Sequence, residues 1–96
     1  MGTDEILKSK RNEILNLATK HGVKNLRVFG SVARGQAGPQ SDVDFLVEVE
    51  PGRTYLDLGA FLMDLEDLLG RKVDLVTERA LHASIKSQVI QEAVPL

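Results

Sequence analysis

Two aspartates, Asp42 and Asp44, stand one residue apart at the start of a hydrophobic run, and a third, Asp74, lies inside a later run of the same kind. In an extended strand, residues two apart point to the same face. The opposite face of the first predicted strand carries the apolar residues Val43, Phe45, Val47 and Val49. We therefore expect Asp42 and Asp44 to share a face of the sheet and to lie outside the core.

The third aspartate gives this pair its chemical interest. If the two runs form neighbouring strands about 4.8 Å apart, Asp74 falls beside Asp42 and Asp44 on one face of the sheet. Three ionised carboxylates at about 4 to 8 Å repel by roughly 2 to 4 kcal/mol per pair when the effective dielectric constant is near 20. Either the pKa of one or more of them rises, or a divalent cation binds among them. We favour a cation, and oxygen ligands without a nearby His or Cys favour Mg²⁺ or Mn²⁺.

A glycine-rich loop precedes these acids. Gly30 lets the backbone approach a ligand closely, and Ser31 offers an N–H and a hydroxyl at an expected helix start, which are the groups that bind phosphate. The alternative for this Gly-Ser pair is an ordinary surface turn. Arg34 could reach a β- or γ-phosphate, or it could be an exposed loop arginine.

The rest of the sequence predicts the elements that hold these residues. Apolar spacing and β-rich runs predict a helix over 3–21, strands over 25–29 and 41–49, a helix over 54–69, a strand over 72–77 and a final helix with Leu81, Ile85 and Val89 on one stripe. Thr54 and Asp57 form a capping-box pattern, and Gly70 ends that helix. Because a long helix joins the last two strands, we expect them to be parallel neighbours in an α/β (α+β) fold of order αβ(loop)βαβα.

Length and composition narrow the functional classes. The 96 residues predict one domain over 1–96 with a modest core, and a net charge of −2 argues against nucleic acid as the main partner. The absence of cysteine excludes disulfides and thiolate chemistry and is compatible with a reducing compartment. The charged N-terminal stretch has no signal-peptide pattern, and no segment is apolar enough to span a membrane. We expect a soluble cytoplasmic protein.

Taken together, Gly30-Ser31, ten intervening residues, Asp42-Val43-Asp44 and the later Asp74 resemble the signature of the DNA polymerase β-like nucleotidyltransferase superfamily. More narrowly, the chain is similar to the minimal nucleotidyltransferases. The similarity runs from the leading helix through the GS-X10-DxD core and the segment LDLGAFLMDLEDLLGRKVDLVT to the final IQEAVPL. It implies the nucleotidyltransferase fold, with a small mixed three-stranded sheet and helices packed on it.

The same resemblance implies an activity. Minimal nucleotidyltransferases of this kind act as antitoxins toward a HEPN-domain RNase toxin, and some transfer AMP from ATP to a tyrosine of that toxin. Carried over by position, Gly30 and Ser31 would hold the nucleotide phosphates, while Asp42, Asp44 and Asp74 would be catalytic and would ligate two Mg²⁺ ions. The implied chemistry is in-line displacement at the α-phosphorus of ATP, with Asp74 also available to accept the proton of the attacking hydroxyl.

Two alternatives of other classes stay open at this stage. The chain could neutralise a HEPN partner by direct binding, as a non-catalytic antitoxin in a hetero-oligomer. It could also be an interaction domain whose acids are surface charges.

Several further residues are expected to be structural. Arg71 is expected to be exposed, Tyr55 to pack near a helix start, and Glu66 to belong to the solvated side of its helix.

Overall fold

A computed structural model describes residues 5–36, 38 and 41–96 of the chain. In that part of the chain, one mixed four-stranded sheet has the strand order β3-β2-β1-β4. The strands are β1 (Val23–Phe29), β2 (Val43–Val49), β3 (Val73–Thr77) and β4 (Val94–Pro95). The helices are α1 (Glu5–Ser9), α2 (Arg11–Lys20), α3 (Gly30–Ala33), α4 (Tyr55–Leu69) and α5 (Ala83–Glu92), with a 3₁₀ turn, η1 (Glu78–Ala80), before α5.

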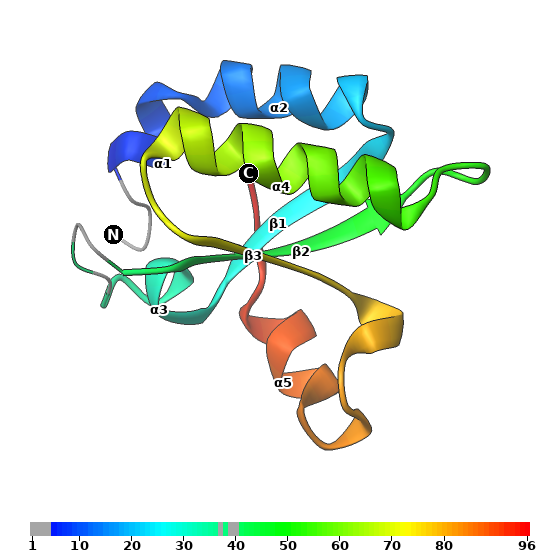
Figure 1. The fold of residues 1–96 in the computed structure, drawn as a ribbon. Coiled ribbons are helices and arrows are strands. Elements are labelled where there is room, and N and C mark those ends of the chain that lie inside the picture. The colour runs from blue at the N-terminus through cyan, green and yellow to red at the C-terminus, as the bar shows by residue number, and fades with distance from the viewer. Residues whose placement is uncertain (1–4, 37, 39–40) are drawn as a thin grey trace.

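The helices lie on both sides of this sheet. Figure 1 shows α2 and α4 side by side over one face and α5 on the opposite side. The main core lies under α2 and α4, and its fully buried centre includes Val43, Phe45, Val47, Phe61 and Leu65. The alternation predicted for the second strand is therefore confirmed. Among the described residues, no helix has the length and apolar character needed to cross a bilayer.

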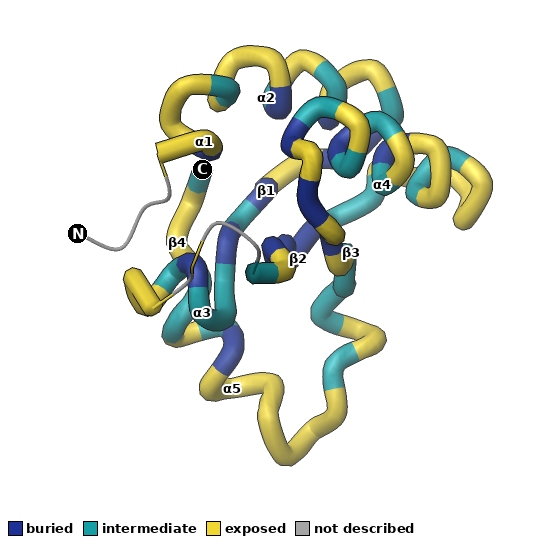
Figure 2. Tube along the Cα trace, turned by 60° about the vertical axis from the view of Figure 1, so that its left-hand side comes forward, coloured by how far each residue is buried: buried dark blue, intermediate teal, exposed yellow. Residues whose placement is uncertain are grey.

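The second face of the sheet is also covered. Leu46 points away from the main core yet is 0% exposed, and it stands outside the main hydrophobic cluster, as does the buried Val89 of α5. Both η1 and α5 lie on this side, and Figure 2 shows that α5 is otherwise exposed along most of its length. Two buried side chains, Leu46 of β2 and Val89 of α5, therefore lie on the face that carries the acids, and we refer to them as the second core.

The structure corrects the prediction of a three-stranded sheet. The fourth strand, β4, is only two residues long and pairs antiparallel with β1. A strand that short has no alternation to detect, and Pro95 at its end is a residue that strands tolerate mainly at edges.

Two predicted element boundaries also change. The helix expected over 3–21 is divided at Lys10, whose backbone (φ −107°, ψ 11°) leaves the helical region, and residues 1–4 lie outside the described part. No Gly or Pro marks this break in the sequence, and the Lys10 N–H still donates to the Ile6 carbonyl across it (3.0 Å). Strand β1 begins at Val23, earlier than the predicted start at residue 25. It contains a bulge, where Asn25 adopts the left-handed conformation (φ 51°).

The crossover between β2 and β3 forms as predicted. The Thr54 hydroxyl accepts a hydrogen bond from the Leu56 N–H (3.2 Å), and the Asp57 carboxylate accepts one from the Thr54 N–H (3.0 Å), so the capping box is present. Helix α4 ends at Gly70, which adopts the left-handed conformation (φ 64°). Strands β2 and β3 are parallel neighbours.

The second core makes a testable prediction. Leu46→Ala is expected to lower the free energy of unfolding by about 2 to 5 kcal/mol, as expected for a leucine in a closed core. Leu65→Ala in the main core is the matched control, because Leu65 is also 0% exposed. Urea denaturation measures both. A cost for Leu46→Ala below about 0.5 kcal/mol, the usual size for a surface position, would show that the second face is open.

Candidate active site

Strand pairing brings two of the predicted acids together. In the parallel pair of β2 and β3, Asp44 lies directly opposite Asp74, between the pairs Val43 with Val73 and Phe45 with Leu75. Asp42 lies one residue before β2 and is exposed. The sequence indicated that Asp74 would lie beside the first two acids but could not give the register. The structure sets the Asp44–Asp74 pair at the beginning of both strands.

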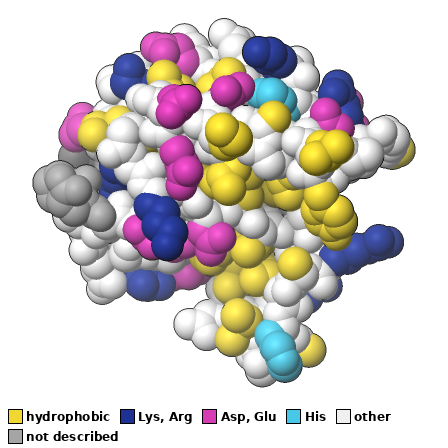
Figure 3. Space-filling view, viewed as in Figure 1, with side chains coloured by type: hydrophobic (Ala, Val, Ile, Leu, Met, Phe, Trp, Pro, Cys, Tyr) yellow, Lys and Arg dark blue, Asp and Glu magenta, His cyan; other side chains and the backbone are white. Residues whose placement is uncertain are grey.

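The electrostatics of this cluster centre on Asp44. Its pKa is raised above the ordinary value of 3.8, first because the carboxyl is partly buried and then because the charges of Asp74 and Asp42 repel its own. Glu92 raises the pKa further, and Arg34 opposes the rise. In Figure 3 acidic side chains, with basic ones among them, gather on the side of the molecule where Figure 1 places α3. The site has an excess of negative charge, which a cation would relieve.

Gly30 lies against the Asp44 carboxylate. It adopts φ +75°, and a Cβ built on it would stand 2.4 Å from Asp44 Oδ2. The conformation therefore favours glycine at this position, and any larger residue would displace the Asp44 carboxylate. Because Phe29 pairs with Asp44 across β1 and β2, the end of β1 delivers Gly30 and then Ser31 to the acids. The Gly-Ser pair singled out in the sequence therefore lies next to Asp44 in the fold.

A residue that sequence reasoning did not select completes this neighbourhood. Glu92, the last residue of α5, accepts a hydrogen bond from the Gly30 N–H (3.3 Å) through Oε2 and pairs with Arg34 Nη1 through Oε1. Arg34 also donates from Nε to Gln36 Oε1 (3.0 Å). The predicted choice for Arg34 was a phosphate contact or an exposed loop arginine. The structure shows a half-exposed arginine held by Glu92.

Comparison with known proteins decides the family. The profile of the nucleotidyltransferase domain matches residues 10–96. This chain belongs to the nucleotidyltransferase domain family. The protein adenylyltransferase MntA of Thermococcus cleftensis is 38% identical over 91 residues, which covers 95% of this chain and 89% of that relative.

Solved structures agree with this assignment. One that is described, provisionally, as a minimal nucleotidyltransferase has 49% sequence identity and a TM-score of 0.85, covering 96% of this chain and 94% of its own. A toxin–antitoxin structure with AMP-PNP has a TM-score of 0.72 at 23% identity, covering 88% of this chain and 69% of its own, which shows a shared fold. The fold predicted from the resemblance is confirmed, apart from its strand count.

The three acids of this nucleotidyltransferase are neighbours without forming a closed metal cage. Their oxygen donors suit Mg²⁺, and partial burial together with the charges of Asp74 and Asp42 raises the pKa of Asp44. Among the residues that the structure describes, however, no three acidic, His or Cys side chains are close enough together to hold one ion. The predicted convergence of all three acids is thus incomplete: Asp44 and Asp74 lie opposite each other in β2 and β3, whereas Asp42 lies one residue before β2.

A buried arginine holds the loop that leads into Asp42. Arg71 was predicted to be exposed, but it is only 8% exposed. Its Nε donates to the Ser41 carbonyl (3.0 Å) and its Nη2 to the Gly38 carbonyl (3.3 Å). The Ser41 hydroxyl in turn accepts a hydrogen bond from the Gly38 N–H (2.9 Å). The two carbonyls provide the reason that a charged side chain can be buried here.

On the β3 side, Glu66 has a similar supporting role. Its Oε2 accepts a hydrogen bond from the Val73 N–H (3.0 Å), directly before Asp74. Glu66 was predicted to lie on the solvated side of its helix. It instead ties α4 to the start of β3, and no local sequence pattern could have revealed this contact.

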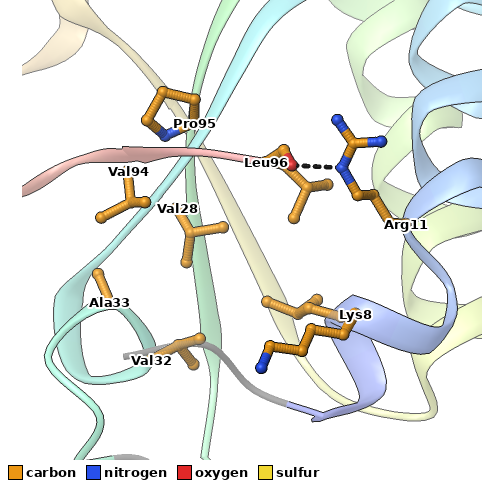
Figure 4. Close-up of a pocket in the computed structure, with 9 residues that line it drawn as sticks. Lys8, Arg11, Val28, Val32, Ala33, Val94, Pro95 and Leu96 are labelled. Carbon is orange, nitrogen blue, oxygen red and sulfur yellow. Dashed lines mark hydrogen bonds between the residues drawn. The ribbon is translucent and has the colours of Figure 1, made fainter. Parts of the chain in front are cut away.

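A cavity of about 150 Å³ lies elsewhere in the nucleotidyltransferase. Figure 4 shows it between α1, α3 and β4, where Val28, Val32, Val94 and Leu96 line it and the Arg11 Nε donates to the Leu96 carbonyl (2.6 Å). Val28 pairs with Phe45 and so belongs to the face opposite Asp44. The cavity therefore does not include the acids.

The charge at Asp44 makes a prediction about stability. Asp44→Asn is expected to raise the melting temperature of the protein by a few degrees in buffer without divalent ions, because it removes a partly buried charge repelled by its neighbours. The pKa of Asp44 is raised above 3.8 in the folded state, so its ionised form destabilises the fold at neutral pH. This destabilisation fades as the pH falls through the raised pKa toward 3.8. Thermal unfolding from pH 7 to pH 4 should therefore show the advantage of the variant shrinking.

Asp67→Asn provides the matched control, because Asp67 is exposed on α4 and is not among the charges that act on Asp44. It should leave the melting temperature unchanged. A lower melting temperature for Asp44→Asn at pH 7 would contradict this account of the site.

Arg71 makes a second prediction. Arg71→Ala is expected to destabilise the protein by about 1.5 to 3 kcal/mol, the usual value of hydrogen bonds to a charged group, and to lower nucleotide affinity by loosening the loop before Asp42. Arg71→Lys keeps the charge but not the planar, two-point contact. Its stability and nucleotide affinity should therefore lie between those of Arg71→Ala and wild type. Urea denaturation and nucleotide titration measure the two effects. Wild-type values for Arg71→Ala would exclude a role for this contact.

Proposed function

We propose that this nucleotidyltransferase is a Mg²⁺-dependent protein adenylyltransferase that moves AMP from ATP to a tyrosine of a HEPN-family toxin RNase, and so acts as an antitoxin. The observation that carries the proposal is the register of β2 with its two neighbours, which sets Asp44 beside Asp74 of β3 and against Gly30 at the end of β1. The relative from Thermococcus cleftensis, named as a protein adenylyltransferase, supports the choice of protein as the acceptor.

The loop after β1 binds the triphosphate in this proposal. Gly30 and Ser31 supply backbone and hydroxyl groups next to the acids, and Arg34 lies one turn further along α3. Arg34 is about half exposed, so its remaining N–H groups stay accessible to a phosphate oxygen while Glu92 holds Nη1. These contacts would turn the α-phosphorus toward Asp44 and Asp74.

The transfer itself is a displacement at the α-phosphorus. The tyrosine oxygen forms a bond to that phosphorus, the bond from phosphorus to the β-phosphate bridging oxygen breaks, and pyrophosphate leaves. The proton of the tyrosine hydroxyl passes to a carboxylate oxygen of Asp74, which is exposed and therefore accessible to an acceptor from outside the molecule.

The metal would be held by the same acids. Asp42, Asp44 and Asp74 would ligate two Mg²⁺ ions, with Mn²⁺ as a substitute, once the ions and the triphosphate draw these carboxylates closer together than they lie in the structure. When bound, the ions would neutralise the triphosphate and lower the pKa of the attacking hydroxyl. We place the reaction in the cytoplasm, where ATP and Mg²⁺ are available.

The proposal is tested by the mass of the partner. Co-expression with a HEPN-family toxin RNase that this chain neutralises should increase the intact mass of that toxin by one or more AMP groups. Asp44→Asn and Asp74→Asn should each reduce transfer of label from α-labelled ATP by at least about a hundredfold, the lower bound for losing a group that acts in the transition state. Asp67→Asn, on the far side of α4, should transfer AMP normally. Undiminished labelling by the Asp44 variant would contradict the proposal.

Three exposed apolar side chains favour a second candidate function. On α4, Tyr55 is 90% exposed, Leu56 85% and Met63 67%, although Tyr55 was predicted to pack against the fold. Such a surface suits a non-catalytic antitoxin that neutralises its partner by direct binding. In that case the Asp44→Asn protein would neutralise the toxin at the same stoichiometry as wild type, and the partner would gain no mass.

A further inference from the structure

Helix α3 is too short to be stable by itself. It comprises the four residues Gly30–Ala33, and a single helical turn is unfavourable in isolation because it fixes several backbone angles for one hydrogen bond. Its closing bonds run from the Arg34 N–H to the Gly30 carbonyl (3.1 Å) and from the Gly35 N–H to the Val32 carbonyl (3.1 Å). Contacts from elsewhere in the fold must therefore keep this turn in place.

Glu92 supplies such contacts at both ends of the turn. One carboxylate oxygen accepts from the N–H of Gly30, where α3 begins, and the other pairs with the guanidinium of Arg34, where α3 ends. The Glu92 side chain is only 18% exposed, so this contact is partly shielded from water, whereas Arg34 is 47% exposed. One side chain thus spans the whole turn.

The backbone of Glu92 is itself well anchored. The Ala93 N–H donates to the Val89 carbonyl (2.9 Å), and Val89 is buried in the second core. Val94, two residues after Glu92, pairs with Val28 in the sheet. A side chain whose backbone is anchored on both sides in this way can impose its position on the single turn of α3.

We propose that Glu92 is a positioning residue for the nucleotide: through Gly30 and Arg34 it holds the turn that carries Ser31 in the conformation that receives the triphosphate. This inference rests on the proposed function, because it assigns Glu92 a task in the same site. Glu92 does not contact the reacting atoms in this account. It acts through Arg34 and the α3 backbone.

Nucleotide binding provides the first test. The probe is an ATP analogue with a methylene group between the α- and β-phosphorus, which cannot transfer AMP. It is titrated into the protein in the presence of Mg²⁺, and calorimetry measures its Kd. Glu92→Ala should raise its Kd about tenfold, and Glu92→Gln, which keeps an acceptor but loses the charge, about threefold. In the AMP-transfer assay KM for ATP should rise by similar factors while kcat changes less than twofold.

Glu78→Ala is the matched control. Glu78 pairs with Arg27 (3.0 Å) on the same side of the sheet, and its removal changes the net charge equally without touching α3. Nucleotide affinity should be unchanged in this variant. In an Arg34→Ala background, removal of the Glu92 carboxylate should cost less than about threefold, because two residues that act as one unit are not additive.

Amide hydrogen exchange of the ligand-free chain is independent of any nucleotide. In Glu92→Ala the amides of Gly30, Arg34 and Gly35 should exchange at least about tenfold faster, while those of β2 stay protected. Unchanged exchange, or an affinity for the probe equal to or tighter than that of wild type, would overturn the positioning role. If exchange accelerates as expected but wild type binds no nucleotide, the proposed function fails and takes the nucleotide role of Glu92 with it.

Discussion

The site depends on the parallel pairing of β2 with β3. One residue of slippage would send Asp74 to the opposite face of the sheet, since side chains alternate along a strand. The buried partners Val43 and Val73, one position earlier, oppose such a slip because they would leave the core under α4. The hydrophobic core therefore sets the distance between two charged residues that never enter it.

The charge cluster lowers the stability of the folded state, and the rest of the fold must offset this loss. Asp44 is partly buried among like charges, and the neighbouring Gly30 adopts a conformation that other residues avoid. Support comes from groups that are distant in sequence. Arg71 holds the loop before Asp42, Glu66 holds the start of β3, and Glu92 holds the turn after β1. All three are charged side chains that lie on a helix or close to its end, and all three form hydrogen bonds with backbone groups.

The sequence predicted those parts of the molecule that are governed by local pattern. The alternation of β2, the capping box at Thr54 and the glycine end of α4 could all be predicted from neighbouring residues, and so could the parallel crossover. The partners of Arg71 and Glu92 could not, because they lie 30 and 62 residues away and a surface charge has the same local pattern as a buried one. The β1 bulge and the two-residue β4 also lack a periodic pattern.

The two edges of the sheet bear on how the protein behaves at high concentration. Strand β3 forms one edge and carries the exposed Asp74, with the exposed Lys72 just before the strand, while β4 forms the other edge and ends in Pro95. An uncovered strand with free backbone groups is a template for pairing between molecules, and charges or a proline discourage this. Asp74 thus has two roles: it belongs to the candidate site, and its charge on an edge strand helps to keep separate chains from joining their sheets.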